Sequence, residues 1–76
     1  MSVAGEVCAI VARQLGCATV TPDARLIEDL AVESIDVVTI GAALEAAFAV
    51  ALSDEVLFEA ESVADLVRAV SDALGA

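Results

Sequence analysis

Ser34 is the residue whose position best suits it to chemistry. It stands between an irregular segment and a long stretch of helical periodicity, with Glu33 before it and Asp36 two positions later. The first N–H groups of a helix lack partners within the helix, so an anion at this position would be stabilised without basic side chains. The alternative is that Ser34 only caps the helix, with Glu33 and Asp36 opposing its dipole. These residues alone leave both interpretations open.

Charge and composition argue against several other functions. The 76 residues include 13 acidic residues, three arginines and no lysine or histidine, which gives a net charge of −10. Without histidine the chain lacks the usual general base near neutral pH and the commonest metal ligand, and it has no Asp-x-Asp-x-Asp-Gly calcium loop. An acidic surface repels phosphate backbones and anionic membranes, so we expect basic protein partners and no nucleic acid.

The length and hydropathy indicate one folded domain, residues 1–76. Hydrophobic residues make up 61% of the chain, and such a content argues against disorder. A domain of this size buries only about 60–65% of its unfolded surface, which leaves no room for a large catalytic cavity. The most apolar stretch, residues 37–53, is shorter than the roughly 20 residues of a membrane span and carries Glu45 near its centre. We therefore expect no membrane span.

The two cysteines, Cys8 and Cys17, do not form a Cys-x-x-Cys pair and are too few for a disulfide scaffold. We expect both to be reduced thiols that serve as small buried or half-buried apolar residues. Reduced thiols, and opening residues in which Glu6 interrupts any targeting pattern, lead us to expect a cytoplasmic protein.

Apolar residues at helical spacing predict an all-α chain. The first long helix is followed by Gly16, the second runs from about Ser34 to Ala49, and the last is opened by Ser62 and Asp65 in a capping-box spacing. Gly75 stands at the expected stop of the last helix. The predicted core stripes are Val3, Val7, Ile10, Val11 and Gln14 or Leu15; Val37, Ile40, Gly41, Leu44, Ala47 and Phe48; and Val63, Leu66, Val67, Val70 and Leu74, with a short third helix over 54–59.

Residues 16–33 lose the helical period and form a long loop, with a turn signal at Thr21-Pro22-Asp23. We expect Leu26, Ile27 and Leu30 to pin this loop to the core. The predicted fold is therefore a small four-helix bundle, with three long helices, one short third helix and a long loop after helix one. A loop of this length in so small a domain is above the usual range, and such loops tend to be functional.

Around Ser34, in Leu30-Ala31-Val32-Glu33-Ser34-Ile35-Asp36, the chain resembles the acyl carrier protein family. In that family a loop ending in Leu-Gly-x-Asp-Ser-Leu leads into the second helix, and its serine carries 4′-phosphopantetheine. The resemblance extends over nearly the whole chain. It includes the first-loop segments Thr21-Pro22-Asp23 and Leu26-Ile27-Glu28-Asp29-Leu30, Leu44-Glu45 and Phe48 of the second helix, and the later helix starts at Asp54 and Ser62-Val63.

The resemblance implies a non-catalytic carrier that holds acyl intermediates as thioesters on a 4′-phosphopantetheine arm attached to Ser34. A phosphopantetheinyl transferase would supply the arm from coenzyme A, and acyl-transferring and ketosynthase-type enzymes of fatty-acid or polyketide biosynthesis would act on it. We expect a monomer. An aminoacyl or peptidyl carrier, an unmodified acidic helical adaptor and a regulatory subunit with a carrier-like fold stay open as alternatives.

Several residues depart from the family pattern. Glu33 replaces the usual Asp and Ala31 the usual Gly, while Thr39 and Ala46 stand where acids are common on the second helix. That helix instead carries a second apolar stripe, Ile35, Val38, Ala42, Ala46 and Ala49, which either the first loop or the third helix covers, or partners dock against. The residues we predict for partner docking are Glu33, Ile35, Asp36, Val38, Ala42 and Glu45. The small residues Gly41, Ala42 and Ala43 favour close helix packing or, alternatively, room for a tethered acyl chain.

Overall fold

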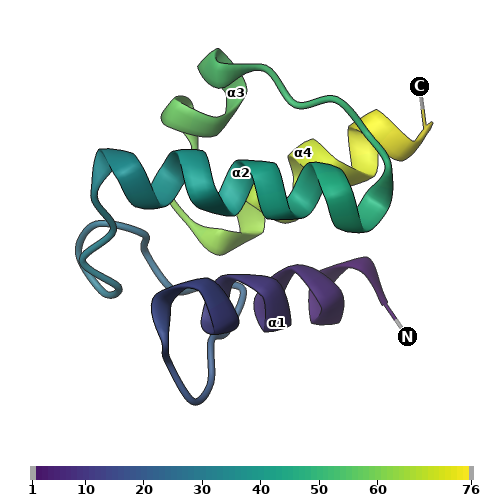
Figure 1. The fold of residues 1–76 in the computed structure, drawn as a ribbon. Helices are drawn as coiled ribbons and strands as arrows, with labels where there is room; N and C mark the ends of the chain where they lie inside the picture. Colours follow the sequence, from purple (N-terminus) through teal and green to yellow (C-terminus); the bar gives the residue numbers. More distant parts are fainter. Residues whose placement is uncertain (1, 76) are drawn as a thin grey trace.

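The computed structural model describes residues 2–75 and contains four helices. They are α1 (Val3–Leu15), α2 (Ser34–Phe48), α3 (Asp54–Glu59) and α4 (Val63–Gly75). In the described part of the chain, the only β pairing is an isolated bridge between Arg25 and Ser62. Figure 1 shows α1 and α2 side by side, with α4 passing behind them and the short α3 beside α2. The predicted all-α fold with a long loop after the first helix is confirmed.

Both ends of α1 follow from local chemistry. The Ser2 hydroxyl accepts a 3.0 Å hydrogen bond from Gly5 N–H and so satisfies one donor of the first turn. Gly16 has φ 72° and ψ 26°, a left-handed conformation that glycine adopts without a Cβ penalty. The N–H of Cys17 then reaches back to the Ala12 carbonyl at 2.9 Å, so the helix ends where the glycine predicted.

The C-terminal end of α2 differs by one residue from the prediction, whereas its start at Ser34 is as predicted. Ala49 lies in the left-handed region at φ 55°, so α2 ends at Phe48 and the expected helical Ala49 is its C-cap. At the start of the helix, Glu33 is the N-cap residue and Ser34 is the first helical residue. The alternative in which Ser34 caps the helix is therefore wrong.

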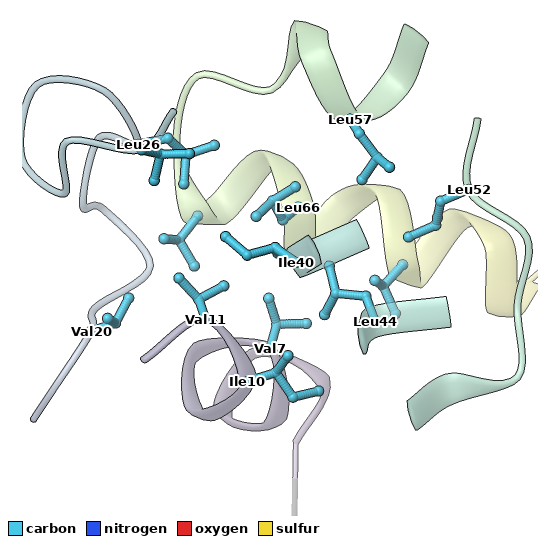
Figure 2. Packing of buried hydrophobic residues seen from close by; sticks show 13 residues of the cluster. Val7, Ile10, Val11, Val20, Leu26, Ile40, Leu44, Leu52, Leu57 and Leu66 are labelled. Atoms are coloured by element: carbon cyan, nitrogen blue, oxygen red, sulfur yellow. The ribbon is translucent and has the colours of Figure 1, made fainter. Parts of the chain in front are cut away.

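Helices and loops together supply the buried core, whose 13 residues are drawn as sticks in Figure 2. Among the predicted stripe positions, Ala47, Gln14 and Leu74 are exposed instead. The core residues are Val7, Ile10, Val11, Val20, Leu26, Val32, Ile40, Leu44, Leu52, Leu57, Val63, Leu66 and Val70.

The loop between α1 and α2 is fixed to the start of α4 by backbone hydrogen bonds. Leu26 N–H donates to the Glu61 carbonyl at 3.0 Å, Val63 N–H to Ala24 at 3.0 Å, and Ala64 N–H to Pro22 at 2.8 Å. This pairing turns Leu26 inward, where it is 4% exposed. Ile27 then points outward and is 76% exposed. The prediction that Ile27 pins the loop is wrong, and Val20 and Val32 are the buried loop residues that it missed.

The predicted capping box of α4 is confirmed. Asp65 N–H donates to the Ser62 hydroxyl at 3.4 Å, and Ser62 N–H donates to Asp65 Oδ2 at 3.3 Å. The same carboxylate also accepts from Glu61 N–H at 2.9 Å. Asp65 thus holds Glu61 and Ser62 in place, and Glu61 pairs through its carbonyl with Leu26 of the first loop.

A glycine of α2 allows α3 to lie close to it. Gly41 is buried, and a Cβ at this position would meet the Leu57 side chain. Leu57 is itself 5% exposed, and Figure 2 shows it pointing into the same core as Ile40 and Leu44. Close helix packing therefore explains Gly41.

No helix in residues 2–75 is long and apolar enough to cross a membrane. Cys8 is half-buried in α1, and burial raises the pKa of its thiol. Cys17 is exposed, because it lies just past the helix end at Gly16, where the chain turns along the surface. The expectation that both cysteines are at least half-buried therefore holds only for Cys8.

Candidate functional site

A capping box formed by Glu33 and Asp36 positions Ser34. Glu33 is extended, with φ −103° and ψ 171°, and Asp36 Oδ2 accepts a 2.9 Å hydrogen bond from Glu33 N–H. The first helical hydrogen bond runs from Val37 N–H to the Glu33 carbonyl at 3.1 Å. Because the Asp36 carboxylate reaches back to the residue before Ser34, the cap falls on Glu33.

This arrangement leaves the Ser34 hydroxyl free. Ser34 is exposed, and its hydroxyl makes no hydrogen bond to any residue between 2 and 75. The N–H groups of Ser34 and Ile35 precede the first helical hydrogen bond and lie at the positive end of the helix dipole. A phosphodiester on this oxygen therefore fits the site: the oxygen is accessible, and the helix start favours its negative charge.

The turn before Ser34 contains a strained alanine. Ala31 has φ 54° and is exposed, and its N–H donates to the Ile27 carbonyl at 3.1 Å. Val32 N–H donates to the Leu26 carbonyl at 2.9 Å, which closes the turn and buries the Val32 side chain. Ala31 thus adopts the left-handed conformation that glycine tolerates best, and this explains why the family usually has glycine here.

The second apolar stripe of α2 is uncovered. Ile35 is 66% exposed and Val38 is 52% exposed. The three alanines of the stripe, Ala42, Ala46 and Ala49, are also exposed. The alternative in which the first loop or α3 covers the stripe is therefore wrong.

Two of the three acidic residues predicted for docking, Asp36 and Glu45, accept hydrogen bonds from backbone N–H groups of the chain. Asp36 is half-buried and holds Glu33 N–H, as described above. Glu45 is also half-buried, and its Oε2 accepts a 2.9 Å hydrogen bond from Leu52 N–H in the connector to α3. Sequence reasoning missed this contact because Leu52 lies seven residues away, beyond the helical spacing. Glu33 remains exposed beside Ser34.

A cavity of about 130 Å³ opens next to Ser34 between the first loop, the start of α2 and α3. Phe58 and Ile27, at 52% and 76% exposure, line this cavity and were missed as site residues. These apolar side chains indicate a site only in the folded chain, where they line the same cavity as Ser34. The full lining is Leu26, Ile27, Val32, Glu33, Ser34, Val37, Leu57, Phe58 and Ala60.

A larger hollow of about 300 Å³ lies elsewhere, between the start of α1 and the end of α2. Its lining comprises Ser2, Val3, Glu6, Ala47 and Phe48. Ser34 is not among these residues, so the smaller cavity is the one that bears on the candidate site.

The two carboxyl groups whose pKa is lowered, those of Asp23 and Asp65, do not line the cavity at Ser34. The pKa of Asp65 is lowered, chiefly by the hydrogen bond from Glu61 N–H, and the pKa of Asp23 is lowered, chiefly by a hydrogen bond with the Thr21 side chain. Within residues 2–75, no three His, Cys, Asp or Glu side chains gather as a metal site would require. The feature that distinguishes the candidate site is the accessible hydroxyl of Ser34.

Comparison with known proteins agrees with this geometry. Residues 5–70 match the family described as "Phosphopantetheine attachment site". The chain is 36% identical over 74 residues to the acyl carrier protein of Helicobacter pylori (strain G27), covering 95% of both chains. It is also 36% identical over 77 residues to the acyl carrier protein of Solidesulfovibrio magneticus, covering 99% of both.

The fold and the site thus define a small helical carrier with a phosphopantetheine attachment site. The chain belongs to the acyl carrier protein family. It is a non-catalytic carrier of acyl thioesters that uses a 4′-phosphopantetheine prosthetic group, and it acts with a phosphopantetheinyl transferase and with enzymes of synthesis.

Proposed function

We propose that Ser34 is the residue to which 4′-phosphopantetheine is attached. The observation that carries this proposal is the exposed Ser34 hydroxyl at the first position of α2, free of hydrogen bonds within the described chain. Asp36 caps the preceding residue, so modification of Ser34 would leave the helix cap intact. Of the other serines, Ser2, Ser53 and Ser62 use their hydroxyls to accept hydrogen bonds at helix starts.

Each part of the site has a separate task in this function. Ser34 Oγ displaces the adenosine-containing part of coenzyme A at phosphorus, forming one P–O bond as another breaks, while the hydroxyl proton passes to the transferase. The free N–H groups at the start of α2 stabilise the resulting phosphodiester charge. The arm supplies a thiol, which is a far better acyl leaving group than an alcohol because its pKa is about 8.5, as for cysteine. Partner enzymes then carry out the acyl chemistry.

The proposed cargo is an acyl intermediate of fatty-acid or polyketide-type synthesis, and the cavity beside Ser34 supports it. Seven of its nine lining residues are apolar, and only Glu33 and Ser34 are polar. An aminoacyl cargo is the second candidate, since Glu33 could pair with its ammonium group at the cavity rim. Loading tests with purified acyl- and aminoacyl-transferring enzymes distinguish the two.

The partners would meet the surface around Ser34 that contains Glu33, Ile35, Asp36, Val38 and Ala42. Ile35 and Val38 expose apolar side chains there, whereas Glu45 holds the α2–α3 connector. We propose that the protein works as a monomer, one domain over residues 1–76, in the cytoplasm. The free thiol of exposed Cys17 is compatible with a reducing compartment.

Intact-mass analysis after co-expression with a phosphopantetheinyl transferase tests the attachment site. Wild type should gain the mass of one phosphopantetheine, and Ser34→Ala should gain none while keeping its helical circular dichroism. Ser71→Ala is the matched control, because Ser71 is an exposed serine within α4, and it should be modified like wild type. An adduct on Ser34→Ala would show that another residue is modified, whereas an unmodified wild type would indicate an adaptor.

A further inference from the structure

The carboxylate of Asp65 contacts two peptide groups that precede α4. Its Oδ2 accepts from Glu61 N–H at 2.9 Å and from Ser62 N–H at 3.3 Å, while Arg68 contacts the other oxygen, Oδ1, at 3.4 Å. A capping box requires only the bond from Ser62 N–H, because Ser62 is the residue before the helix. The shorter bond from Glu61 N–H goes beyond capping, since it fixes a residue that lies outside the helix.

Glu61 joins two walls of the cavity beside Ser34. One wall comes from the first loop and includes Leu26, and another comes from α3 and the residue after it, Phe58 and Ala60. The Glu61 carbonyl accepts a 3.0 Å hydrogen bond from Leu26 N–H, and Glu61 directly follows Ala60 in the chain. The position of Glu61 therefore sets how the two walls stand relative to each other.

The connection continues from Leu26 to the residues just before Ser34. Val32 N–H donates to the Leu26 carbonyl at 2.9 Å, so both peptide groups of Leu26 are held. Val32 also lines the cavity and lies two positions before Ser34. A chain of hydrogen bonds thus runs from the Asp65 carboxylate to the end of the first loop at Val32.

Two further hydrogen bonds hold the first loop to α4 away from the cavity. Val63 N–H donates to the Ala24 carbonyl at 3.0 Å, and Ala64 N–H donates to the Pro22 carbonyl at 2.8 Å. None of these four residues lines the cavity. Because these bonds do not involve the Asp65 carboxylate, its loss would loosen the cavity walls while the loop stays attached to α4.

We propose that Asp65 is a positioning residue for the cavity beside Ser34: it fixes Glu61, and through Glu61 the walls that receive the group carried on Ser34. Capping of α4 alone would change the stability of the fold but not the fit of that group. This inference rests on the proposed attachment at Ser34 and on the proposed use of the cavity by an acyl cargo.

Urea unfolding of the unmodified protein and of the protein carrying a butanoyl-phosphopantetheine arm tests this role. A group that occupies the cavity stabilises the folded chain. The wild-type urea midpoint should therefore rise by roughly 1 M on modification, the equivalent of one to two buried methylene groups. In Asp65→Ala this rise should shrink by about half or more. Asp65→Asn should restore the rise, because its amide oxygen can still accept from Glu61 N–H.

Ser62→Ala is the matched control, because it removes the hydroxyl that caps the same helix but keeps the Asp65 carboxylate. Both variants should lose stability, whereas only Asp65→Ala should lose the rise on modification. Equal rises in wild type and Asp65→Ala overturn the positioning role. Intact mass separates this result from failure of the proposed function: an unmodified wild type overturns the attachment and this inference with it. A modified wild type whose midpoint does not rise overturns the use of the cavity and the positioning role, but not the attachment.

Amide hydrogen exchange in the wild type provides a second test that needs no substitution. Coupling between two sites is reciprocal, so a group that fills the cavity must in turn stabilise the bond between Leu26 and Glu61. The butanoyl arm should slow exchange of Leu26 N–H by about threefold or more. Cys17 N–H is the reference, because it donates to the Ala12 carbonyl at 2.9 Å near the other end of the loop, and its exchange should not change. A Leu26 N–H that exchanges equally fast in both forms contradicts the proposed coupling.

Discussion

Substitution of Glu45 tests whether its carboxylate stabilises the fold or serves a partner. Its Oε2 accepts from Leu52 N–H at 2.9 Å, and Leu52 is only 9% exposed. Glu45→Ala leaves this N–H without a partner, which costs about 1–3 kcal/mol of unfolding free energy. With a urea m-value of about 1 kcal/mol/M for a small domain, the unfolding midpoint should fall by roughly 1–3 M.

Glu45→Gln separates the hydrogen bond from the charge. The amide oxygen can still accept from Leu52 N–H, so its urea midpoint should stay within about 1 M of wild type. Asp72→Ala removes an exposed acid of α4 and controls for the loss of negative charge. Circular dichroism during urea titration gives all three midpoints. A Glu45→Ala midpoint equal to that of wild type would refute the stabilising role, and a raised transferase KM for Glu45→Gln would assign the carboxylate to docking.

Two further substitutions test the loops around the site. The left-handed φ of 54° costs Ala31 about 1–2 kcal/mol in the folded state. Glycine removes this strain, and although it raises the conformational entropy of the unfolded chain, that opposing effect is smaller. Ala31→Gly should therefore stabilise the fold by about 0.5–1 kcal/mol. A lower urea midpoint for this variant would contradict the assigned strain. The Asp65 pKa is lowered by folding, chiefly by Glu61 N–H, so its carboxylate contributes stability above its unfolded pKa of about 3.9 and loses it as pH falls through the folded value. The midpoint difference between wild type and Asp65→Ala should be present at neutral pH and shrink below about pH 4; a difference independent of pH would rule this out.

Much of the candidate site was predictable because its signals are local. Ser34 opens a helix, Asp36 lies within reach of the helix start, and both facts follow from residues four positions apart or fewer. The interpretation of Ser34 as the N-cap residue nevertheless placed the cap one position too late, because the cap is Glu33. Ser34 and Glu33 are both compatible with the end of a helix, and the reach of the Asp36 carboxylate decided between them.

The surroundings of Ser34 were less predictable because they depend on contacts between distant segments. Ile27 and Phe58 come together at the cavity because the first loop pairs with the residues before α4 and Leu57 packs on Gly41. Helical periodicity within either segment does not show that Ile27 and Phe58 line the same cavity. The contact between Glu45 and Leu52 likewise joins a helix to a connector whose path no local pattern specifies.

The sequence by itself determined the four helices, their principal stops at Gly16 and near Phe48, and the serine at the loop–helix junction, because helix caps and 3.6-residue periodicity act over a few residues. Only the tertiary structure decided which apolar residues face water. A loop residue is turned inward or outward by its backbone partners, as Leu26 and Ile27 show. A helix with apolar residues on two faces can bury only the face that its neighbours reach, and in α2 this leaves the stripe that begins at Ile35 exposed.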